Sequence, residues 1–380
     1  AVAPVTTDSD TYNLILGNSL TGGDGAKGVG SPSGVAGNGG NGGAGIEVDG
    51  ASNTFNFAGS ITGGAAGGGG QGLWGSSTGG FPGTAANAIQ VDGANNSFNI
   101  TGAMTGGRGG NGGFGGTSRN GGNGAAAIGV NGTGNTISVD GATVAGGNGG
   151  DRGNLGYAGG TGGVAVQLNG SSNRLTTSGA LNGGSPGVGS TAVANAVQSG
   201  GSGNTVELRD GHSFGGDVVV QSGSHTLALG GTTDASFDSA LMAGTQPGSD
   251  GTTQFVGFSN LEKTGTSTWT LTGTRGDSGT TTISQGELIA DAAALGSGNI
   301  TNNATLAFSR SDTFTVTNLI SGSGGVANLG SGTNILAATN TYTGFTTMVE
   351  VKVRATACAH AMNVDLKVGN PGDADGDGVI

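Results

Sequence analysis

Serine and histidine residues supply the first candidates for chemistry. Two stretches centred on Ser77 and Ser185 have the Gly-x-Ser-x-Gly pattern of hydrolase nucleophiles. That chemistry requires the serine to stand between a strand and a helix, and with 89 glycines among 380 residues such matches arise by chance. His212, His225 and His360 have no paired acid close in sequence, so only the fold could assemble a triad from them. We therefore expect no catalytic residues and no enzyme.

An acidic segment near the C-terminus offers oxygen ligands for calcium. Asp373, Asp375 and Asp377 occupy positions 1, 3 and 5 of an EF-hand-type loop, with Gly378 at the sharp turn. The acidic residue that such a loop needs about twelve positions along is missing. The segment resembles the start of a dockerin or a similar calcium module, cut short. Calcium is the only cofactor to consider, and a flexible acidic tail is the favoured interpretation.

A tripeptide in the second half, Arg275, Gly276 and Asp277, is a candidate for adhesion. It resembles an integrin-recognition motif. It falls at the turn of a repeated strand pattern, where we expect it to be exposed. Because a three-residue match has little specificity, a plain polar turn is the favoured alternative.

The composition excludes several classes of protein. Gly is far above its usual share of about 7%, which disfavours helices. The net charge is −12, with no basic cluster, so nucleic acid is not an expected partner. A single cysteine, Cys358, allows no internal disulfide. No apolar run approaches the 18 residues of a membrane span.

Five copies of one short pattern organise the first half of the chain. Each copy runs from a β-branched residue to an asparagine, through a turn rich in Gly, Asp, Asn and Ser. The copies are residues 46–53 (IEVDGASN), 89–96 (IQVDGANN), 128–135 (IGVNGTGN), 166–173 (VQLNGSSN) and, more weakly, 197–204 (VQSGGSGN). Each continues into short alternating stretches that end in Gly-Gly, so each unit predicts three short strands over about 20 residues.

These units predict the stacked coils of a parallel β-helix. A single coil cannot bury its apolar positions, whereas stacked coils bury a continuous column. The last residue of each copy would then form an asparagine ladder along one turn, at Asn53, Asn96, Asn135, Asn173 and Asn204. Two aspartates and two asparagines also recur at one coil position, namely Asp49, Asp92, Asn131 and Asn169. They favour turn chemistry over a paired-carboxylate site.

Glycine-rich inserts separate the coils and become shorter along the chain. Runs such as residues 39–45 (GGNGGAG) and 109–115 (GGNGGFG) favour Gly-Gly-X triplets. A period of three is compatible with polyproline-II-like backbone and also with flexible loops. We favour ordered or partly ordered projections. Because the inserts recur at one point of each coil, they are expected to leave from one face, which in repeat proteins often makes the interactions.

The second half resembles the passenger-associated repeat of bacterial autotransporters. Residues 261–273 (LEKTGTSTWTLTG) and 281–288 (TTISQGEL) carry this likeness, and residues 334–346 (NILAATNTYTGFT) give a looser second copy. The resemblance implies a right-handed β-helical passenger domain exported to a bacterial surface. Independently of the family, the alternation of Trp269 and Leu271 with threonines predicts a half-buried strand.

Together these observations predict an all-β protein, a parallel β-helix with Gly-rich insert loops. The expected divisions are a repeat region at 1–216, a passenger-like region at 217–348, and a terminal strand with an acidic tail at 349–380. We expect a structural or adhesive protein that is extracellular or on the bacterial outer-membrane surface. Its partner would be an extracellular or cell-surface ligand, or copies of itself stacked end to end into filaments. A polysaccharide-active β-helix enzyme is the alternative.

Overall fold

The computed structural model describes residues 5–14, 17–73, 75, 77–191, 193–242 and 254–348 of the chain. Short parallel strands stacked in long sheets make up nearly all of its regular structure. The two helices in the described part have four residues each, η1 (Ser239–Met242) and α1 (Ala292–Leu295). The fold is therefore the all-β parallel β-helix that the sequence predicts.

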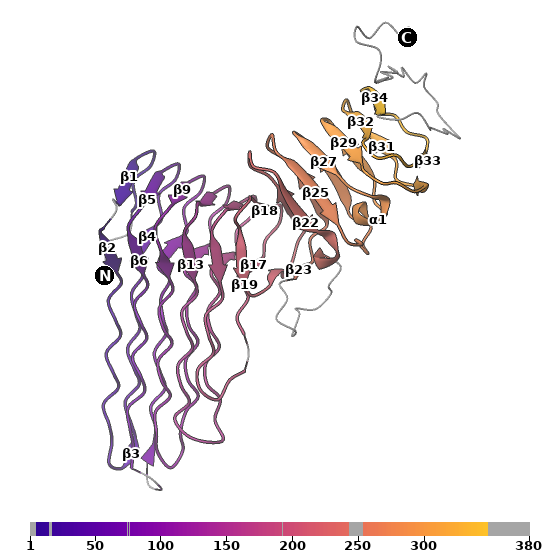
Figure 1. Ribbon diagram of the computed structural model, residues 1–380. Helices are drawn as coiled ribbons and strands as arrows, with labels where there is room; N and C mark the ends of the chain where they lie inside the picture. Colours follow the sequence, from indigo (N-terminus) through magenta and orange to yellow (C-terminus); the bar gives the residue numbers. More distant parts are fainter. Residues whose placement is uncertain are drawn as a thin grey trace, which may run out of the picture. The chain divides into compact units, whose positions relative to one another are not determined.

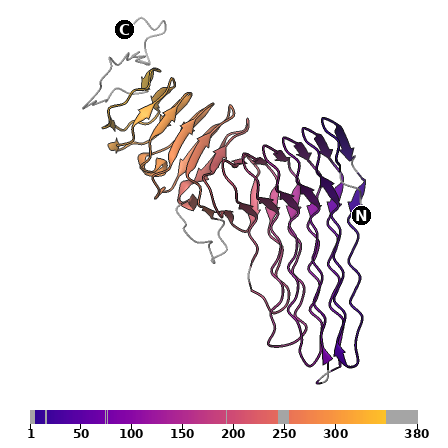
Figure 2. The ribbon, with the colours of Figure 1, turned by 180° about the vertical axis from the view of Figure 1, so that it is seen from behind.

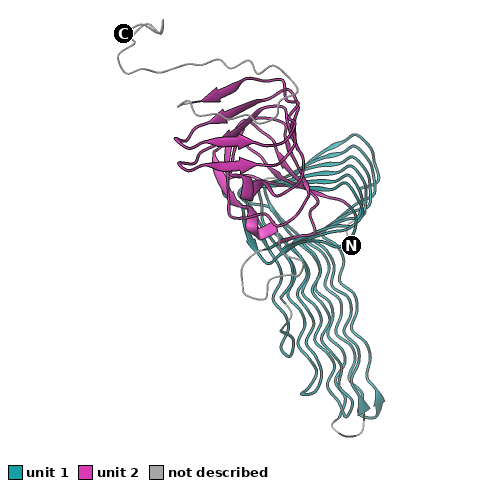
Figure 3. Ribbon diagram, turned by 90° about the vertical axis from the view of Figure 1, so that its right-hand side faces the viewer, with its two compact units in different colours: residues 1–206, 211–223, 246–254 teal, residues 207–210, 224–245, 255–380 magenta. Residues whose placement is uncertain are grey.

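The chain divides into two compact units, which Figure 3 colours separately. Unit 1 contains residues 1–206, 211–223 and 246–254, and unit 2 contains residues 207–210, 224–245 and 255–380. The expected boundary after residue 216 falls inside segment 211–223, which belongs to unit 1. The terminal strand and acidic tail expected at 349–380 lie outside the described residues.

Unit 1 is built from coils of three short strands, stacked so that each strand pairs in parallel with its counterpart one coil away (Figures 1 and 2). One face contains β1 (Thr11–Leu14), β5 (Thr54–Phe57), β9 (Ser97–Ile100), β12 (Thr136–Val139), β15 (Arg174–Thr177) and β18 (Thr205–Leu208). The second contains β2 (Ser19–Thr21), β6 (Ser60–Thr62), β10 (Met104–Thr105), β13 (Thr143–Ala145), β16 (Ala180–Asn182) and β19 (Ser213–Gly215). The third contains β4 (Ile46–Val48), β8 (Ile89–Val91), β11 (Ile128–Val130), β14 (Val166–Leu168), β17 (Val197–Ser199) and β20 (Val218–Val220).

Apolar side chains in matching positions form columns inside the coils of unit 1. Tyr12, Phe55 and Phe98 are aligned by the strand register. Their rings stack, with centroids 5.0 Å apart in the first pair and 4.8 Å in the second. Ile137 and Leu175 continue the column and are fully buried. The columns bury what one coil could not bury alone.

Five glycine-rich inserts leave unit 1 on one side, between the second and third strands of successive coils (Figure 1). They cover residues 22–45, 63–88, 106–127, 146–165 and 183–196, and we call them inserts 1 to 5. Each runs out, turns and runs back. Short strands β3 (Gly34–Val35) and β7 (Ser77–Thr78) pair at the turns of inserts 1 and 2. The inserts are therefore ordered projections rather than flexible loops.

Hydrogen bonds between the inserts repeat every third residue. The N–H groups of Gly22, Gly25 and Gly28 donate to the carbonyls of Thr62, Ala65 and Gly68 at 2.8 to 2.9 Å. Outgoing and returning segments are bonded as well, as from Gly40 N to Ala26 O at 2.7 Å. This is the three-residue period of polyproline II helices, here held together by bonds between segments. We call the assembled inserts the glycine bundle.

Close packing explains why the bundle needs glycine. A Cβ on Gly67 would overlap the carbonyl oxygen of Ala26 on the neighbouring segment, and one on Gly147 would overlap that of Gly107. The third residue of each triplet faces outward and can carry a side chain. The Gly-Gly-X pattern therefore encodes two contacts with neighbouring segments and one position open to solvent.

Unit 2 is also built from short parallel strands stacked in sheets, and the connections between its strands are shorter than the inserts of unit 1. One sheet face contains β21 (Thr226–Leu229), β24 (Asn260–Lys263), β26 (Thr280–Ile283), β28 (Ile300–Asn302) and β31 (Ile320–Ser321). A second contains β22 (Ala235–Asp238), β25 (Thr268–Thr272), β27 (Glu287–Ile289), β29 (Thr305–Phe308), β32 (Gly325–Asn328) and β34 (Thr346–Met348). The remaining strands are β23 (Phe255–Val256), β30 (Phe314–Val316) and β33 (Asn334–Leu336). Trp269 and Leu271 of β25 point inward, as their alternation predicts.

Candidate functional site

The serines of the two nucleophile-like motifs have structural surroundings. Ser77 belongs to β7 at the turn of insert 2, and its buried hydroxyl donates to the carbonyl of Leu73 at 2.9 Å. Ser185 lies in insert 5, where its N–H donates to Oδ1 of Asn148. Neither serine stands between a strand and a helix. His212 belongs to unit 1 and His225 to unit 2.

The aspartates expected to bind calcium, Asp373, Asp375 and Asp377, lie outside the described residues, as does His360. Calcium binding there stays a prediction. In the part of the chain that the structure describes, no group of three or more His, Cys, Asp or Glu side chains gathers as a metal site would require.

The expected exposure of the tripeptide turn holds for Gly276, which is exposed, and in part for Asp277, which is half-buried, but it is wrong for Arg275. The Arg275 side chain is buried, and its Nε donates to Oδ2 of Asp277 at 2.9 Å. Its Nη1 donates to the hydroxyl of Thr281 at 3.1 Å, and its Nη2 lies 2.8 Å from Oδ1 of Asp277. The basic and acidic groups of the tripeptide thus face each other. Adhesion through Arg275, Gly276 and Asp277 has no geometric support here.

The five asparagines of the repeat stack at one turn, as their spacing predicts. In each pair of neighbours, the main-chain N–H of one donates to Oδ1 of the next at 2.8 Å, and the side chains are buried. Each Nδ2 donates to a main-chain carbonyl of the preceding coil, as from Asn135 to Gly93 at 3.0 Å. The ladder comprises Asn53, Asn96, Asn135, Asn173 and Asn204.

The recurring acid and amide positions form an exposed column beside this ladder. Asn131 Nδ2 donates to Oδ1 of Asp92 at 2.8 Å, and Asn169 Nδ2 donates to Oδ1 of Asn131 at 2.9 Å. On the other side of Asp92, Asp49 occupies the same position of the preceding coil, one residue after the paired Val48 and Val91. The hydrogen-bonded side chains tie the turns of successive coils together, and as exposed groups at a turn they favour turn chemistry over acid and base work.

The outer faces of the glycine bundle carry the third residue of each triplet. Many of these residues are asparagines whose Oδ1 accepts a main-chain N–H from the next insert. Asn38 accepts from Phe81, and Asn123 accepts from Thr161, both at 3.0 Å. These bonds satisfy donors that would otherwise face water. The recurrence of Asn in the Gly-Gly-X triplets is the sequence signal for them.

The turn ends of the inserts expose large apolar side chains. Val29 and Val35 flank the turn of insert 1, Leu73 that of insert 2, and Leu155 lies in the turn of insert 4. With Val188 and Val193 of insert 5, these side chains are from 58% to 79% exposed. We call the six residues the apolar turn ends. Sequence reasoning missed them because isolated apolar residues within Gly-rich runs show no strand period.

A buried lysine in unit 2 also escapes sequence reasoning. Lys263 of β24 is fully buried, and its Nζ donates to the carbonyls of Thr264, Gly265 and Gln285 at 2.7, 2.9 and 3.2 Å. Burial lowers its pKa from 10.5 to about 8, against the opposing pull of Asp234 and Glu207. Through its bonds to Thr264 and Gly265 on one coil and to Gln285 on the next, Lys263 connects two neighbouring coils.

No helix among the described residues has both the length and the apolar character needed to cross a membrane. The chain matches no model of a known protein family, no curated protein and no solved structure.

Proposed function

We propose that this protein is an exported bacterial structural and adhesive solenoid, displayed outside the cell, which makes contacts through the apolar turn ends. The single observation that carries the proposal is where the exposed apolar residues lie. Of the nine large apolar residues that are exposed in the described part, seven lie in the inserts: the six apolar turn ends and Phe81. Solvent-exposed apolar groups gathered in one region favour an interaction surface.

The glycine bundle gives these apolar groups a rigid support. Each outgoing segment is hydrogen bonded both to the next insert and to returning segments, as from Gly67 N to Gly40 O at 2.9 Å and Gly70 N to Gly37 O at 2.8 Å. A loop of the same composition would lose much conformational entropy on binding. Because the bundle is already ordered, that cost is met on folding, and the apolar turn ends are presented in fixed positions.

The test compares apolar residues at the turn ends with apolar residues elsewhere. Bacteria displaying the chain should attach to alkyl-coated glass more strongly than to hydroxyl-coated glass. The triple variant Val35→Ser, Leu73→Ser and Leu155→Ser should lose most of this attachment. A control variant, Leu329→Ser with Phe345→Ser, removes two exposed apolar residues of unit 2 and should attach like the unchanged chain. Equal attachment by the triple variant would contradict the proposal.

Self-assembly is the second part of the proposal. Within the described residues, β1 and β2 each pair on one side alone, with β5 and β6. An open strand edge is a template for another copy. Electron microscopy over a concentration series tests this, because end-to-end stacking gives rods that lengthen with concentration. Rods of one fixed length at every concentration would exclude filament formation and leave the adhesive part of the proposal intact.

A further inference from the structure

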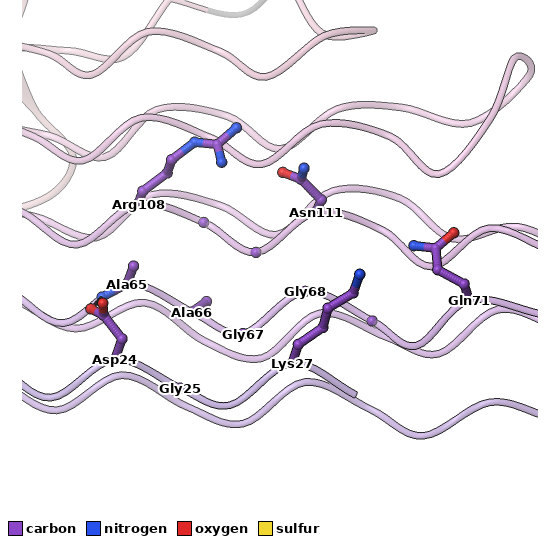
Figure 4. A pocket seen from close by; sticks show the side chains of 13 residues that line it. Asp24, Gly25, Lys27, Ala65, Ala66, Gly67, Gly68, Gln71, Arg108 and Asn111 are labelled. Atoms are coloured by element: carbon purple, nitrogen blue, oxygen red, sulfur yellow. Dashed lines mark hydrogen bonds between the residues drawn. The ribbon is translucent and has the colours of Figure 1, made fainter. Parts of the chain in front are cut away.

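A groove of about 360 Å³ crosses the outer face of the outgoing segments of inserts 1, 2 and 3 (Figure 4). Its floor is glycine and alanine of insert 2. The polar side chains that line it come from all three inserts: Asp24, Lys27, Gln71, Arg108 and Asn111. The groove lies on the side of the glycine bundle, and its lining includes none of the apolar turn ends.

The groove exists because one outward position has no side chain. The hydrogen bonds from Gly28 N to Gly68 O and from Gly69 N to Asn111 O place Lys27, Gly68 and Asn111 in one row across the inserts. Figure 4 shows Lys27 and Asn111 on the two segments that flank Gly68. A Cβ on Gly68 would meet no atom closer than the Asn111 carbonyl oxygen at 3.4 Å. Steric packing therefore does not require glycine here.

Main-chain donors are left open in this groove. Where the outward residue of this face is Asn or Asp, its side-chain oxygen accepts the outward N–H of the next insert, as Asn111 does for Asp151 at 3.0 Å and Asp24 does for Ala65 at 2.8 Å. Lys27, Ala65 and Gly68 have no side-chain acceptor. The N–H groups that stand in register with these three residues on the next insert belong to Gly68, Arg108 and Asn111, respectively. None of these three N–H groups donates a hydrogen bond among the described residues.

Two cationic side chains stand beside these donors. Lys27 is exposed. Arg108 pairs with Asp151 at 3.2 Å, but their side chains are 50% and 38% exposed, so the pair contributes at most about 1 kcal/mol and opens readily. Asp24 is the one carboxylate in the lining, and one of its oxygens is already bonded to Ala65 N. The groove thus offers N–H donors and two cations.

We propose that this groove binds the carboxylate groups of an acidic polysaccharide. Open N–H groups and cations select an anionic acceptor. The outward N–H groups of Arg108 and Asn111 are three residues apart, about 9 Å in polyproline II geometry, which suits a polymer with carboxylates at regular intervals. The side-chain amides of Gln71 and Asn111 are placed for hydroxyl groups, and the glycine floor lets a sugar ring approach the backbone. Because the net charge is −12, general attraction of anions cannot replace these local contacts.

The first test measures binding of a defined oligogalacturonate by calorimetry. The double variant Lys27→Gln and Arg108→Gln should bind at least tenfold more weakly. The charge-matched control, Arg152→Gln with Arg310→Gln, removes two cations that do not line the groove and should keep affinity within twofold. A loss of affinity equal in both variants would overturn the proposal, since only overall charge would then matter.

A second variant closes the groove without removing a charge. In Gly68→Asn, the new Oδ1 stands in register to accept the N–H of Asn111, as Asn111 accepts that of Asp151. We expect at least tenfold weaker binding of oligogalacturonate and an unchanged or higher melting temperature. Unchanged binding by a folded Gly68→Asn variant would overturn the proposal.

Two further probes define the ligand class. A neutral glucan oligomer of the same length should bind at least tenfold more weakly than oligogalacturonate, and an oligoglutamate should bind more weakly than the sugar acid. Tighter binding of oligoglutamate would assign the groove to acidic peptides instead and overturn the polysaccharide assignment. Equal binding of the neutral glucan, or no measurable binding of oligogalacturonate, would also overturn it.

Discussion

The main-chain N–H of Asn96 donates to Oδ1 of Asn135 at 2.8 Å, although the two residues are 39 positions apart. The side chain of Asn135 also donates from Nδ2 to the carbonyl of Gly93 at 3.0 Å. One buried amide thus satisfies a donor and an acceptor of the neighbouring coil. These two bonds fix the register between neighbouring coils, because a shift by one residue would break both of them.

Asn135→Ala is therefore expected to destabilise unit 1 strongly. The substitution leaves the Asn96 N–H and the Gly93 carbonyl without their partners, and each buried unsatisfied group costs about 1 to 3 kcal/mol. We expect the free energy of unfolding to fall by about 2 to 5 kcal/mol in urea titrations. Asn131→Ala, in the exposed column, is the control and should change stability by less than about 1 kcal/mol. Equal effects would show that the buried ladder has no special role.

Two adjacent glycines of insert 2 should respond differently to the same substitution. Gly67→Ala places a Cβ against the Ala26 carbonyl of a neighbouring segment, whereas Gly68→Ala places it at the open groove. Overpacking costs about 1 to 3 kcal/mol or more, so Gly67→Ala should lower the melting temperature of the bundle by several degrees. Gly68→Ala should leave it nearly unchanged. Similar melting temperatures for both variants would contradict the packing seen between segments.

Much of the fold can be predicted from repeats in the sequence. The five asparagines of the ladder recur once in each coil and so mark the repeat in the sequence. The strands that follow them, such as β5 and β9, have the expected alternation of buried and less buried residues. The Gly-Gly-X triplets favoured ordered projections without excluding flexible loops, and it is the hydrogen bonds between the inserts that distinguish the two. Local pattern and coil stacking agree here, so the prediction succeeds.

The candidate surfaces could not be predicted in the same way. Gly68 is one glycine among 89 in the sequence, and its importance arises only from the row that it shares with Lys27 and Asn111. The burial of Arg275 likewise depends on Thr281, which the coil brings within hydrogen-bonding distance. In both cases the decisive neighbour is set by register between segments, which single motifs do not contain.

Lys263 should make the stability of unit 2 depend on pH. In the unfolded chain this lysine keeps its proton up to about pH 10.5, whereas in the folded chain it loses the proton near pH 8. Between these values the unfolded state binds more protons, so the free energy of unfolding rises with pH. The slope from this group approaches about 1.4 kcal/mol per pH unit, and its contribution is constant below pH 7.

The pH dependence is measured against Lys263→Met. In a Trp74→Phe background, Trp269 is the remaining tryptophan and reports on unit 2 by fluorescence. Between pH 7 and 10, the chain with Lys263 should gain about 2 to 3 kcal/mol relative to Lys263→Met. Lys27→Met removes an exposed lysine and should keep the full slope. Parallel pH profiles for the Lys263→Met variant and its parent would contradict the lowered pKa.

The Arg275 turn provides a prediction that separates a structural role from an adhesive one. Asp277→Ala would leave a buried guanidinium without its carboxylate, which costs about 2 to 4 kcal/mol. A matched control exists at Arg310, which pairs with Asp312 two residues later while both side chains are exposed to solvent. Asp312→Ala should cost at most about 1 kcal/mol.

These two aspartate variants also decide what the tripeptide does. If Asp277 acts by neutralising Arg275, Asp277→Ala lowers the unfolding midpoint in urea, and attachment of displaying cells falls only where the protein unfolds. An adhesive motif would behave in the opposite way, with attachment lost and the urea midpoint unchanged. Because Asp277 accepts a hydrogen bond through Oδ2 and makes an ion-pair contact through Oδ1 with a guanidinium that solvent does not reach, we expect the first outcome.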